Sequence, residues 1–230
     1  MMLLTLVYCL ITASCWSCDD SDPTVKTDST KQELPQGPDP NFHIYVCFGQ
    51  SNMEGSAKIE AMDKEINRRL QVMQPMNCPN LSRKEGVWYT AEPPLSQCHA
   101  GLSPADYFGR TMIQNLPDSI RVGLIVVAVG GCDIRLFDKE KYANHTNTYP
   151  EEWFQQKITG YGGNPYQRII DLASAAQKDG VIKGFLLHQG ETNTGDTAWP
   201  GYVKRVYDQM IADLELNAVD APLLAGETVH

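Results

Sequence analysis

Short apolar runs alternate with longer amphipathic segments along most of this chain. The apolar runs have the length of buried β-strands and occupy residues 43–48, 121–129, 181–187 and 221–225. The segments between them show the apolar spacing of helices and occupy residues 56–74, 104–116, 165–179 and 202–216.

Two of the predicted helices also have recognisable ends. Ser103 followed by Pro104 is typical of a helix N-terminus, and Gly180 is typical of a C-terminus. An alternation of strands and helices predicts a parallel sheet with helices on both faces. We therefore expect a three-layer α/β/α domain of the flavodoxin-like kind.

Two long segments without a clear period interrupt this alternation, at residues 75–103 and 133–163. Long loops at the active edge of a sheet often shape a substrate cleft. In the first segment, Trp88 and Tyr89 can either stack on a sugar ring or pack the loop onto the core.

Three of the predicted strands end in polar turns that contain glycine. Ser51 follows the first strand, Gly131 the second and Gln189 the third. Parallel strands bring their carboxyl ends to one edge of a sheet, where open α/β sheets bind ligands. A hydroxyl, a backbone amide and a carboxamide can then converge on one oxyanion, as acyl transfer requires. The alternative for Ser51, taken alone, is a helix N-cap.

These turns resemble the motifs of the SGNH hydrolase superfamily. Residues 49–53 (Gly-Gln-Ser-Asn-Met), the glycines at 130–131 and residues 188–191 (His-Gln-Gly-Glu) look like its sialate O-acetylesterase-type branch, which includes carbohydrate esterase family 6. With residues 101–110 and 192–196, the chain most resembles acetylxylan esterase domains of gut and rumen Bacteroidetes. The likeness runs from about residue 42 to the end of the chain.

The resemblance implies a role for several of these residues. Ser51 would be the nucleophile, and its own amide, the amide of Gly131 and the side chain of Gln189 would form the oxyanion hole. Glu191 would orient the loop or a base, unless it is a solvated loop carboxylate. Substrate contacts are expected from neighbouring polar side chains and from the aromatic loop, namely from Gln50, Asn52, Asn193 and Trp88.

One part of the superfamily pattern is missing from the sequence. The general base of the superfamily is a histidine in an Asp-x-x-His or Asp-x-His motif near the C-terminus, and this chain has neither motif. Without a base, a serine hydroxyl stays protonated near neutral pH. We expect the domain to be incomplete at its C-terminus, with the base beyond residue 230, and none of the five histidines present to replace it.

The charge and the remaining motifs exclude several classes of partner. The formal net charge of −9 argues against nucleic acid, because such binding depends on lysines and arginines that neutralise phosphates. The sequence has no P-loop and no zinc-type cysteine spacing. We therefore expect an acetylated glycan as the partner, and no cofactor or metal.

Residues 1–18 and 19–40 differ in composition from the rest of the chain. The first stretch is apolar but too short for a comfortable membrane span, which indicates an export signal. Cys18, or else Cys15, resembles the acylated residue of a bacterial lipoprotein, and a cleaved secretory peptide is the alternative. The second stretch has the composition of a disordered linker. We expect a secreted or surface-anchored protein whose domain occupies residues 41–230.

Export would place the domain in an oxidising compartment, where cysteines can pair. Cys78 and Cys98 flank the first long segment and could close it by a disulfide. Cys47 lies inside a predicted strand and is expected to be buried and inert. Cys132 stands beside the oxyanion glycine, and a partner in a missing region is one alternative for it.

The expected function is that of a secreted serine esterase that removes O-acetyl groups from acetylated xylan or a related plant polysaccharide. Two alternatives stay open: a carbohydrate-binding module on an esterase scaffold, and an esterase acting on sialic acid or a lipid. The negative net charge disfavours anionic sialosides, and no large apolar lid pattern indicates a lipid.

Overall fold

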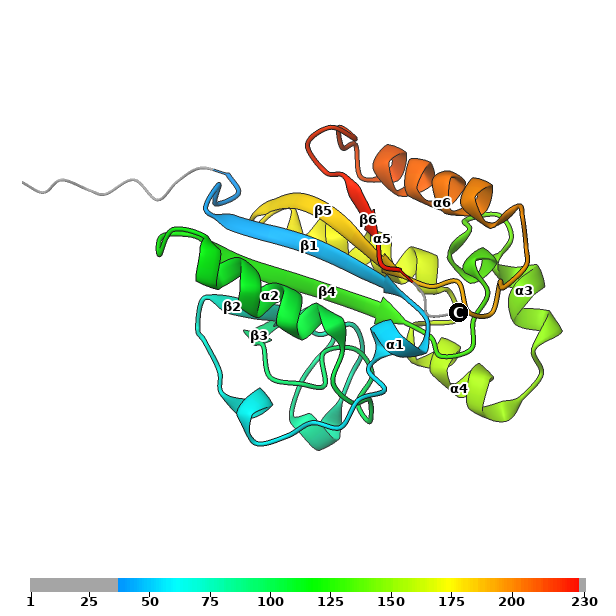
Figure 1. The fold of residues 1–230 in the computed structure, drawn as a ribbon, viewed down its shortest axis with the longest axis horizontal. Coiled ribbons are helices and arrows are strands. Elements are labelled where there is room, and N and C mark those ends of the chain that lie inside the picture. Colours follow the sequence, from blue (N-terminus) through cyan, green and yellow to red (C-terminus); the bar gives the residue numbers. More distant parts are fainter. Residues whose placement is uncertain (1–36, 228–230) are drawn as a thin grey trace, which may run out of the picture. The chain divides into compact units, whose positions relative to one another are not determined.

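The computed structural model describes residues 37–227, which form a six-stranded sheet in the order β3-β2-β4-β1-β5-β6 (Figure 1). The strands are β1 (Phe42–Gly49), β2 (Leu70–Met73), β3 (Trp88–Thr90), β4 (Arg121–Ala128), β5 (Val181–His188) and β6 (Leu223–Ala225). The helices are α1 (Ser51–Glu54), α2 (Pro104–Asn115), α3 (Tyr142–Thr148), α4 (Glu152–Gly160), α5 (Pro165–Ala176) and α6 (Trp199–Asp213). Short 3₁₀ helices occupy Met62–Lys64, Pro79–Leu81 and Ile134–Phe137.

Strand β1 lies at the centre of the sheet, between β4 and β5, and runs parallel to both. Gly49 at its end pairs with Ala128 on one side and with His188 on the other. The three strands therefore end level with one another at one edge. Strands β2 and β6 continue the parallel order, while β3 is antiparallel to β2. The predicted α/β fold with a largely parallel sheet is confirmed.

Alternate residues of β1 face opposite sides of the sheet, as the two-residue period of a strand requires. Ile44, Val46 and Phe48 belong to one hydrophobic cluster, to which α5 and α6 contribute, and Cys47 belongs to a second cluster, to which α2 contributes. The sheet is therefore the middle layer of the predicted α/β/α arrangement (Figure 1).

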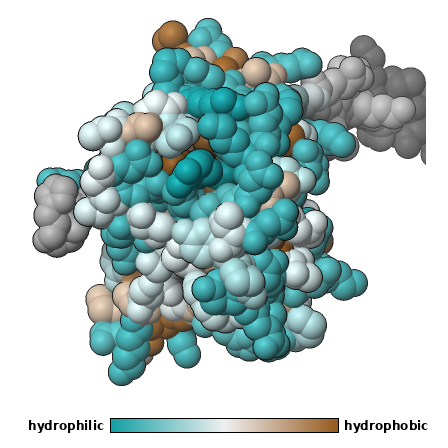
Figure 2. Space-filling model, turned by 90° about the vertical axis from the view of Figure 1, so that its right-hand side faces the viewer, coloured by the Kyte–Doolittle hydropathy of each residue, from teal (hydrophilic) through white to brown (hydrophobic). Residues whose placement is uncertain are grey.

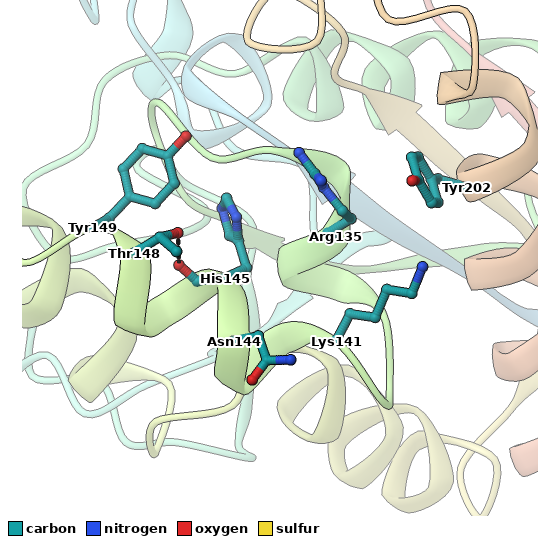
Figure 3. Close-up of a pocket in the computed structure, with 7 residues that line it drawn as sticks. All are labelled: Arg135, Lys141, Asn144, His145, Thr148, Tyr149 and Tyr202. Carbon is teal, nitrogen blue, oxygen red and sulfur yellow. Dashed lines mark hydrogen bonds between the residues drawn. The ribbon is translucent and has the colours of Figure 1, made fainter.

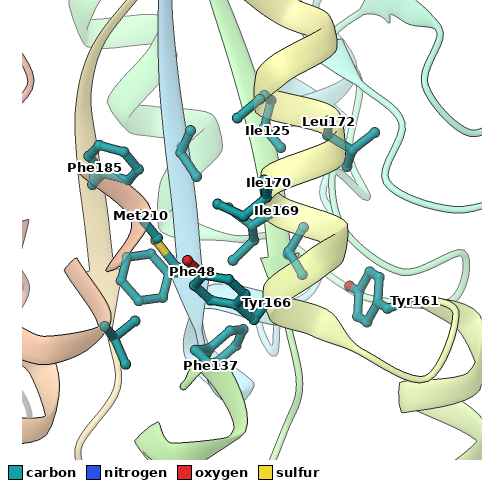
Figure 4. Packing of buried hydrophobic residues seen from close by; sticks show 14 of the residues in the cluster. Phe48, Ile125, Phe137, Tyr161, Tyr166, Ile169, Ile170, Leu172, Phe185 and Met210 are labelled. Atoms are coloured by element: carbon teal, nitrogen blue, oxygen red, sulfur yellow. The ribbon is translucent and has the colours of Figure 1, made fainter. Parts of the chain in front are cut away.

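The larger cluster packs α5 and α6 against the sheet (Figure 4). Phe48 at the end of β1 meets Phe137 edge to face, with ring centroids 5.5 Å apart. Ile169 on α5 and Met210 on α6 are fully buried in the same cluster. Because burial of such side chains supplies most of the stability of a domain, this packing fixes β1 and the turn that follows it.

The predicted helix over residues 56–74 is wrong. The 3₁₀ turn at Met62–Lys64 and strand β2 occupy part of this range instead. Met62 and Ile66, which would share one face of a helix, are 61% and 56% exposed, so the segment buries no apolar helical face. Leu70 and Val72 are buried in β2, where they pair with β4.

The two segments without a clear period contain short elements that the sequence pattern does not reveal. The first includes β3 and is closed by a disulfide between Cys78 and Cys98, which confirms the pairing that we considered. The second contains α3 and α4. Cys47 and Cys132 are buried and free, and the burial expected for Cys47 is confirmed.

Several predictions concern residues that the structure does not describe. The leader at residues 1–18 with Cys18, most of the linker at residues 19–40, and His230 lie outside the described residues, and these predictions stay predictions. Between residues 37 and 227, no helix is long and apolar enough to span a membrane.

We expect Val46→Ala to lower the free energy of unfolding by about 2–3 kcal/mol, because it removes two buried methyl groups and leaves a cavity. Val46 is fully buried in β1, whereas Val219 is 85% exposed. The matched change Val219→Ala should alter stability by less than about 0.5 kcal/mol. Urea titrations measure both values, and equal losses would contradict the core position of β1.

Candidate active site

The turn after β1 depends on a glycine. Gly49 has a φ of +153°, and a Cβ at this position would come within 2.1 Å of the carbonyl oxygen of His188. Gln50 donates its amide to that same oxygen at 3.0 Å, and Val129 donates to the Gly49 carbonyl at 3.0 Å. The ends of β1, β4 and β5 are therefore in direct contact, and Ser51 stands where the chain leaves the sheet.

Ser51 is the first residue of α1 and is partly exposed at this edge. It is not the N-cap of the helix, because that position belongs to Gln50, which makes no side-chain cap bond. In the described part of the chain, no hydrogen bond involves Ser51 Oγ, while its carbonyl accepts from Ser56 Oγ at 2.8 Å. The capping alternative is thus excluded, and the hydroxyl is free to react.

Two backbone amides at this edge of the sheet, those of Ser51 and Gly131, have no acceptor within residues 37–227. The Ser51 amide is the first of its helix and has no intrahelical partner. Gly131 follows β4 with a φ of +79°. A Cβ on the neighbouring Gly130 would lie 3.6 Å from Ser51 Cβ, so the loop after β4 lies against the serine.

An ion pair borders Ser51 on the side of this loop. Glu54, one helical turn after Ser51, pairs with Lys157 of α4 and also accepts the amide of Gly130. A Cβ on Gly130 would lie 3.1 Å from Lys157 Nζ and 3.2 Å from Glu54 Oε2. The carboxylate therefore occupies the Gly130 amide and leaves the Gly131 amide as the free donor of the loop.

The prediction that Gln189 donates to an oxyanion disagrees with its surroundings. The side chain is 1% exposed, and its Nε2 donates to Asn193 Oδ1 at 2.7 Å, to the Cys132 carbonyl at 3.2 Å and to Gln50 Oε1 at 3.3 Å. Its Oε1 accepts from Trp199 Nε1 at 2.5 Å. An indole only donates and a carbonyl only accepts, so the amide cannot be turned round. Three acceptors share two hydrogens, and none is left for an oxyanion.

Gln50 and Asn193, which we expected to contact substrate, are buried parts of the same network. Gln50 is 4% exposed, and its Oε1 accepts from the amide of Gly190 at 3.3 Å. Asn193 is 6% exposed, donates to Asp133 at 2.8 Å and accepts from the amide of Ile134 at 3.1 Å. Both side chains hold loops together in this network, and their expected contact with a substrate stays a prediction.

Glu191 lies next to this network and has two polar neighbours of its own. Its Oε1 accepts from Asn52 Nδ2 at 2.7 Å and lies 3.8 Å from His188 Nδ1. Glu191 Oε2 and His188 Nδ1 are buried without a hydrogen-bond partner in the part of the chain that the structure describes. Glu191 is therefore not a freely solvated carboxylate, and with Asn52 it joins α1 to the end of β5.

Trp88 does not belong to this site, and its prediction as a substrate contact is wrong. Its ring meets Phe42, the first residue of β1, with centroids 4.9 Å apart. Its Nε1 donates to Asp179, just before β5, at 2.9 Å. Trp88 therefore packs against the amino ends of the strands, at the edge opposite Ser51, as the alternative reading of this aromatic loop allowed.

The other described histidines occupy three different parts of the chain. His43 opens β1 at the opposite edge, and His99 is exposed in the disulfide-closed loop. His145 is buried, and burial lowers its pKa. Burial also raises the pKa of the Cys132 thiol well above its usual value, so this cysteine does not compete as a nucleophile. Among residues 37–227, no three His, Cys, Asp or Glu side chains gather as metal ligands would.

Two polar cavities flank this edge of the sheet, and the face around it is mainly hydrophilic (Figure 2). One, of about 410 Å³, lies between α3 and α6 and presents Arg135, Lys141, Tyr149 and Tyr202 (Figure 3). Lys141 Nζ lies 4.8 Å from the centre of the Tyr202 ring. We call this one the tyrosine cavity.

The other cavity, of about 340 Å³, is lined by Glu54, Lys157 and the loop that the disulfide closes. We call it the disulfide cavity. It agrees with the expectation that the first long segment shapes a cleft at the active edge.

Sequence reasoning did not identify Glu54, Lys157 or Trp153. Glu54 stands one helical turn after Ser51, and that spacing is a signal that could have indicated it. Lys157 and Trp153 lie on α4, far from Ser51 in the sequence, and no local pattern indicates them. A Cβ on Gly131 would nevertheless lie 3.1 Å from Cη2 of Trp153.

Comparisons with known proteins agree with this geometry. Residues 41–229 match the model of a family described as carbohydrate esterase, sialic acid-specific acetylesterase. A probable carbohydrate esterase of Arabidopsis thaliana is 26% identical over 204 residues, which make up 82% of this chain and 70% of that protein.

Two solved structures share the fold. An X-ray structure of a protein from Arabidopsis thaliana superposes with a TM-score of 0.60 at 21% identity, covering 81% of this chain and 74% of the other. The crystal structure of NanS superposes with a TM-score of 0.56 at 17% identity, covering 84% of this chain and 68% of the other.

We expect Gln189→Ala to lower the free energy of unfolding by about 1–3 kcal/mol, because buried partners such as the Trp199 N–H would be left unpaired. Gln156 is exposed on α4 and donates to Glu152 at 2.9 Å, so Gln156→Ala is a matched control that should cost less than about 0.5 kcal/mol. Urea unfolding measures both losses. A fall in turnover with unchanged stability would instead restore Gln189 as an oxyanion donor.

Proposed function

The chain belongs to the carbohydrate esterase, sialic acid-specific acetylesterase family, and we propose on this basis that it is a serine esterase that removes acetyl groups from an O-acetylated carbohydrate. The observation that supports this most is that the loop after β4 lies against Ser51, while the amides of Ser51 and Gly131 have no acceptor within residues 37–227. Donors aimed at a developing oxyanion are usually the largest single contribution to catalysis of acyl transfer. The backbone would supply them here without Gln189.

In the proposed reaction, Ser51 Oγ attacks the carbonyl carbon of the acetyl ester while a general base takes the hydroxyl proton. The carbonyl oxygen becomes an oxyanion, which the amides of Ser51 and Gly131 stabilise. The bond between this carbon and the sugar oxygen then breaks, and the base returns the proton to the sugar oxygen. Water attacks the acetyl-serine in the same way and releases acetate.

The general base is proposed to be a histidine outside residues 37–227. Glu191 supports this, because its buried Oε2 lacks a partner within those residues and could orient such a histidine. His188 is the alternative at the same edge, 3.8 Å from Glu191. The variant His188→Asn separates the two, because turnover that depends on Ser51 should persist if the base lies elsewhere.

Acetylated xylan or a related plant polysaccharide is the first candidate substrate, on the resemblance of residues 49–53 and 188–191 to acetylxylan esterase domains. An O-acetylated sialic acid is the second. The family description names sialic acid, and the tyrosine cavity presents Lys141, which suits a carboxylate, beside Arg135, which is paired with Asp133. This local positive charge weakens the objection to sialosides that the net charge of −9 raised.

In a form of the protein that includes the general-base histidine, Ser51→Ala should lower acetate release from an acetylated xylo-oligosaccharide by at least about 10³-fold, because it removes the attacking oxygen. Ser174 is exposed on α5 and away from the site, so Ser174→Ala should retain the parent rate. Acetate released per mole of protein measures both. Turnover that survives in Ser51→Ala would exclude the proposed mechanism.

The two candidate substrates differ in charge, because a xylo-oligosaccharide is neutral and a sialic acid carries a carboxylate. We expect kcat/KM on an acetylated xylo-oligosaccharide to exceed that on an O-acetylated sialic acid by at least about tenfold. Steady-state acetate release on the two substrates measures this ratio. The reverse order, with a KM for the sialic acid that rises about tenfold in Lys141→Met, would establish the second candidate instead.

A further inference from the structure

The disulfide cavity adjoins the ion pair of Glu54 and Lys157. Glu54 and Lys157 line it, and both side chains meet the loop after β4 at Gly130. A Cβ at Gly130 would lie within 3.2 Å of each side chain and 3.6 Å from Ser51 Cβ. Glu54 and Lys157 thus connect the wall of this cavity to the loop that lies against Ser51.

The opposite wall of the cavity is the loop closed by the Cys78–Cys98 disulfide. Asn80 and His99 are exposed polar side chains on this wall, and Met76 adds apolar surface. Asn80 donates to the Cys98 carbonyl at 3.0 Å, which keeps its carboxamide in place with its oxygen available as an acceptor. The cavity thus combines apolar surface with several hydrogen-bonding groups, as small-molecule sites do.

An exposed indole stands next to the cavity. Trp153 is 51% exposed and precedes Lys157 by one turn on the same side of α4. Its ring lies 5.8 Å from Lys157 Nζ and meets Phe154 edge to face at 5.5 Å. It also lies over Gly131, whose amide is the proposed oxyanion donor. These contacts hold the ring in place while half of its surface stays open to solvent.

We propose that the disulfide cavity, together with Trp153, binds the neutral sugar ring that carries the acetyl ester. A pyranose has an apolar face of C–H groups, which would pack on the exposed indole, and hydroxyls at its rim, which would bond Asn80, His99 and Lys157. This proposal rests on the proposed esterase function, which supplies the acetyl ester as the reacting group. The contacts to the sugar ring are inferred from the residues of the cavity.

The charges around the two cavities favour a neutral sugar in this one. Lys157 is compensated by Glu54 within the wall, and the Glu54 carboxylate would repel an acidic sugar. In the tyrosine cavity, by contrast, Lys141 faces the Tyr202 ring and forms no ion pair with any residue of the described range 37–227, while Arg135 is paired with Asp133. An acidic sugar would therefore bind in the tyrosine cavity, and the two locations can be told apart.

The test measures binding of an acetylated xylo-oligosaccharide by calorimetry, in a Ser51→Ala background so that the ligand is not consumed. Trp153→Ala and His99→Ala are each expected to weaken binding by about tenfold, and Trp153→Phe should recover most of the affinity because it keeps an aromatic face. Gln156→Ala, on the same helix as Trp153, is the matched control and should bind as the parent does.

Unchanged affinity in both Trp153→Ala and His99→Ala would overturn the proposal, as would the absence of oligosaccharide binding in the parent. A loss of affinity in Lys141→Met instead would place the sugar in the tyrosine cavity and also overturn it. Hydrolysis of 4-nitrophenyl acetate, an ester without a sugar, is measured separately on the protein with Ser51 intact. If that activity is absent in a form of the protein that includes the general-base histidine, while sugar binding depends on Trp153 and His99, the esterase function fails and the sugar site stands.

Discussion

The buried carboxamide of Gln189 is the contact on which the rest of the site depends. It joins the turn after β1 through Gln50, the loop after β4 through Cys132, and the start of α6 through Trp199. Each of these polar groups would be costly to bury alone, but together they satisfy one another. The loops are consequently stable only as a set. This arrangement would suit the proposed reaction, in which amide donors must be in place before charge develops.

The Glu54 carboxylate determines which backbone amide of the loop after β4 stays without an acceptor. Glu54 accepts the Gly130 amide and pairs with Lys157, so one of two adjacent backbone donors is occupied and the Gly131 amide is not. The same two side chains form a wall of the disulfide cavity. The ion pair of Glu54 and Lys157 therefore both leaves the Gly131 amide free and shapes one wall of the disulfide cavity.

The sequence was informative where a residue's role depends on the backbone and misleading where it depends on distant partners. Buried apolar runs and glycine turns placed Ser51 and Gly131 at one edge, because strand pairing and backbone geometry are local consequences of those patterns. The direction of the Gln189 side chain depends on Trp199 and Asn193, and the place of Trp88 depends on Phe42 and Asp179. Residue spacing in the sequence does not predict side-chain contacts between residues that lie far apart along the chain. The helix expected over residues 56–74 failed for the same reason, since pairing with β4 decides the state of its last residues.

The order of the strands in the sheet also affects how the chain folds. The central strand pairs with partners that follow much later along the chain, Phe42 with Arg121 and His43 with Val181. Closing such large loops costs entropy before any contact compensates for it, so parallel pairings of this kind form slowly. During synthesis, the segment around Ser51 leaves the ribosome long before β5 exists. The nascent chain therefore has to keep its central apolar strand, β1, from premature association until the last of its neighbours arrives.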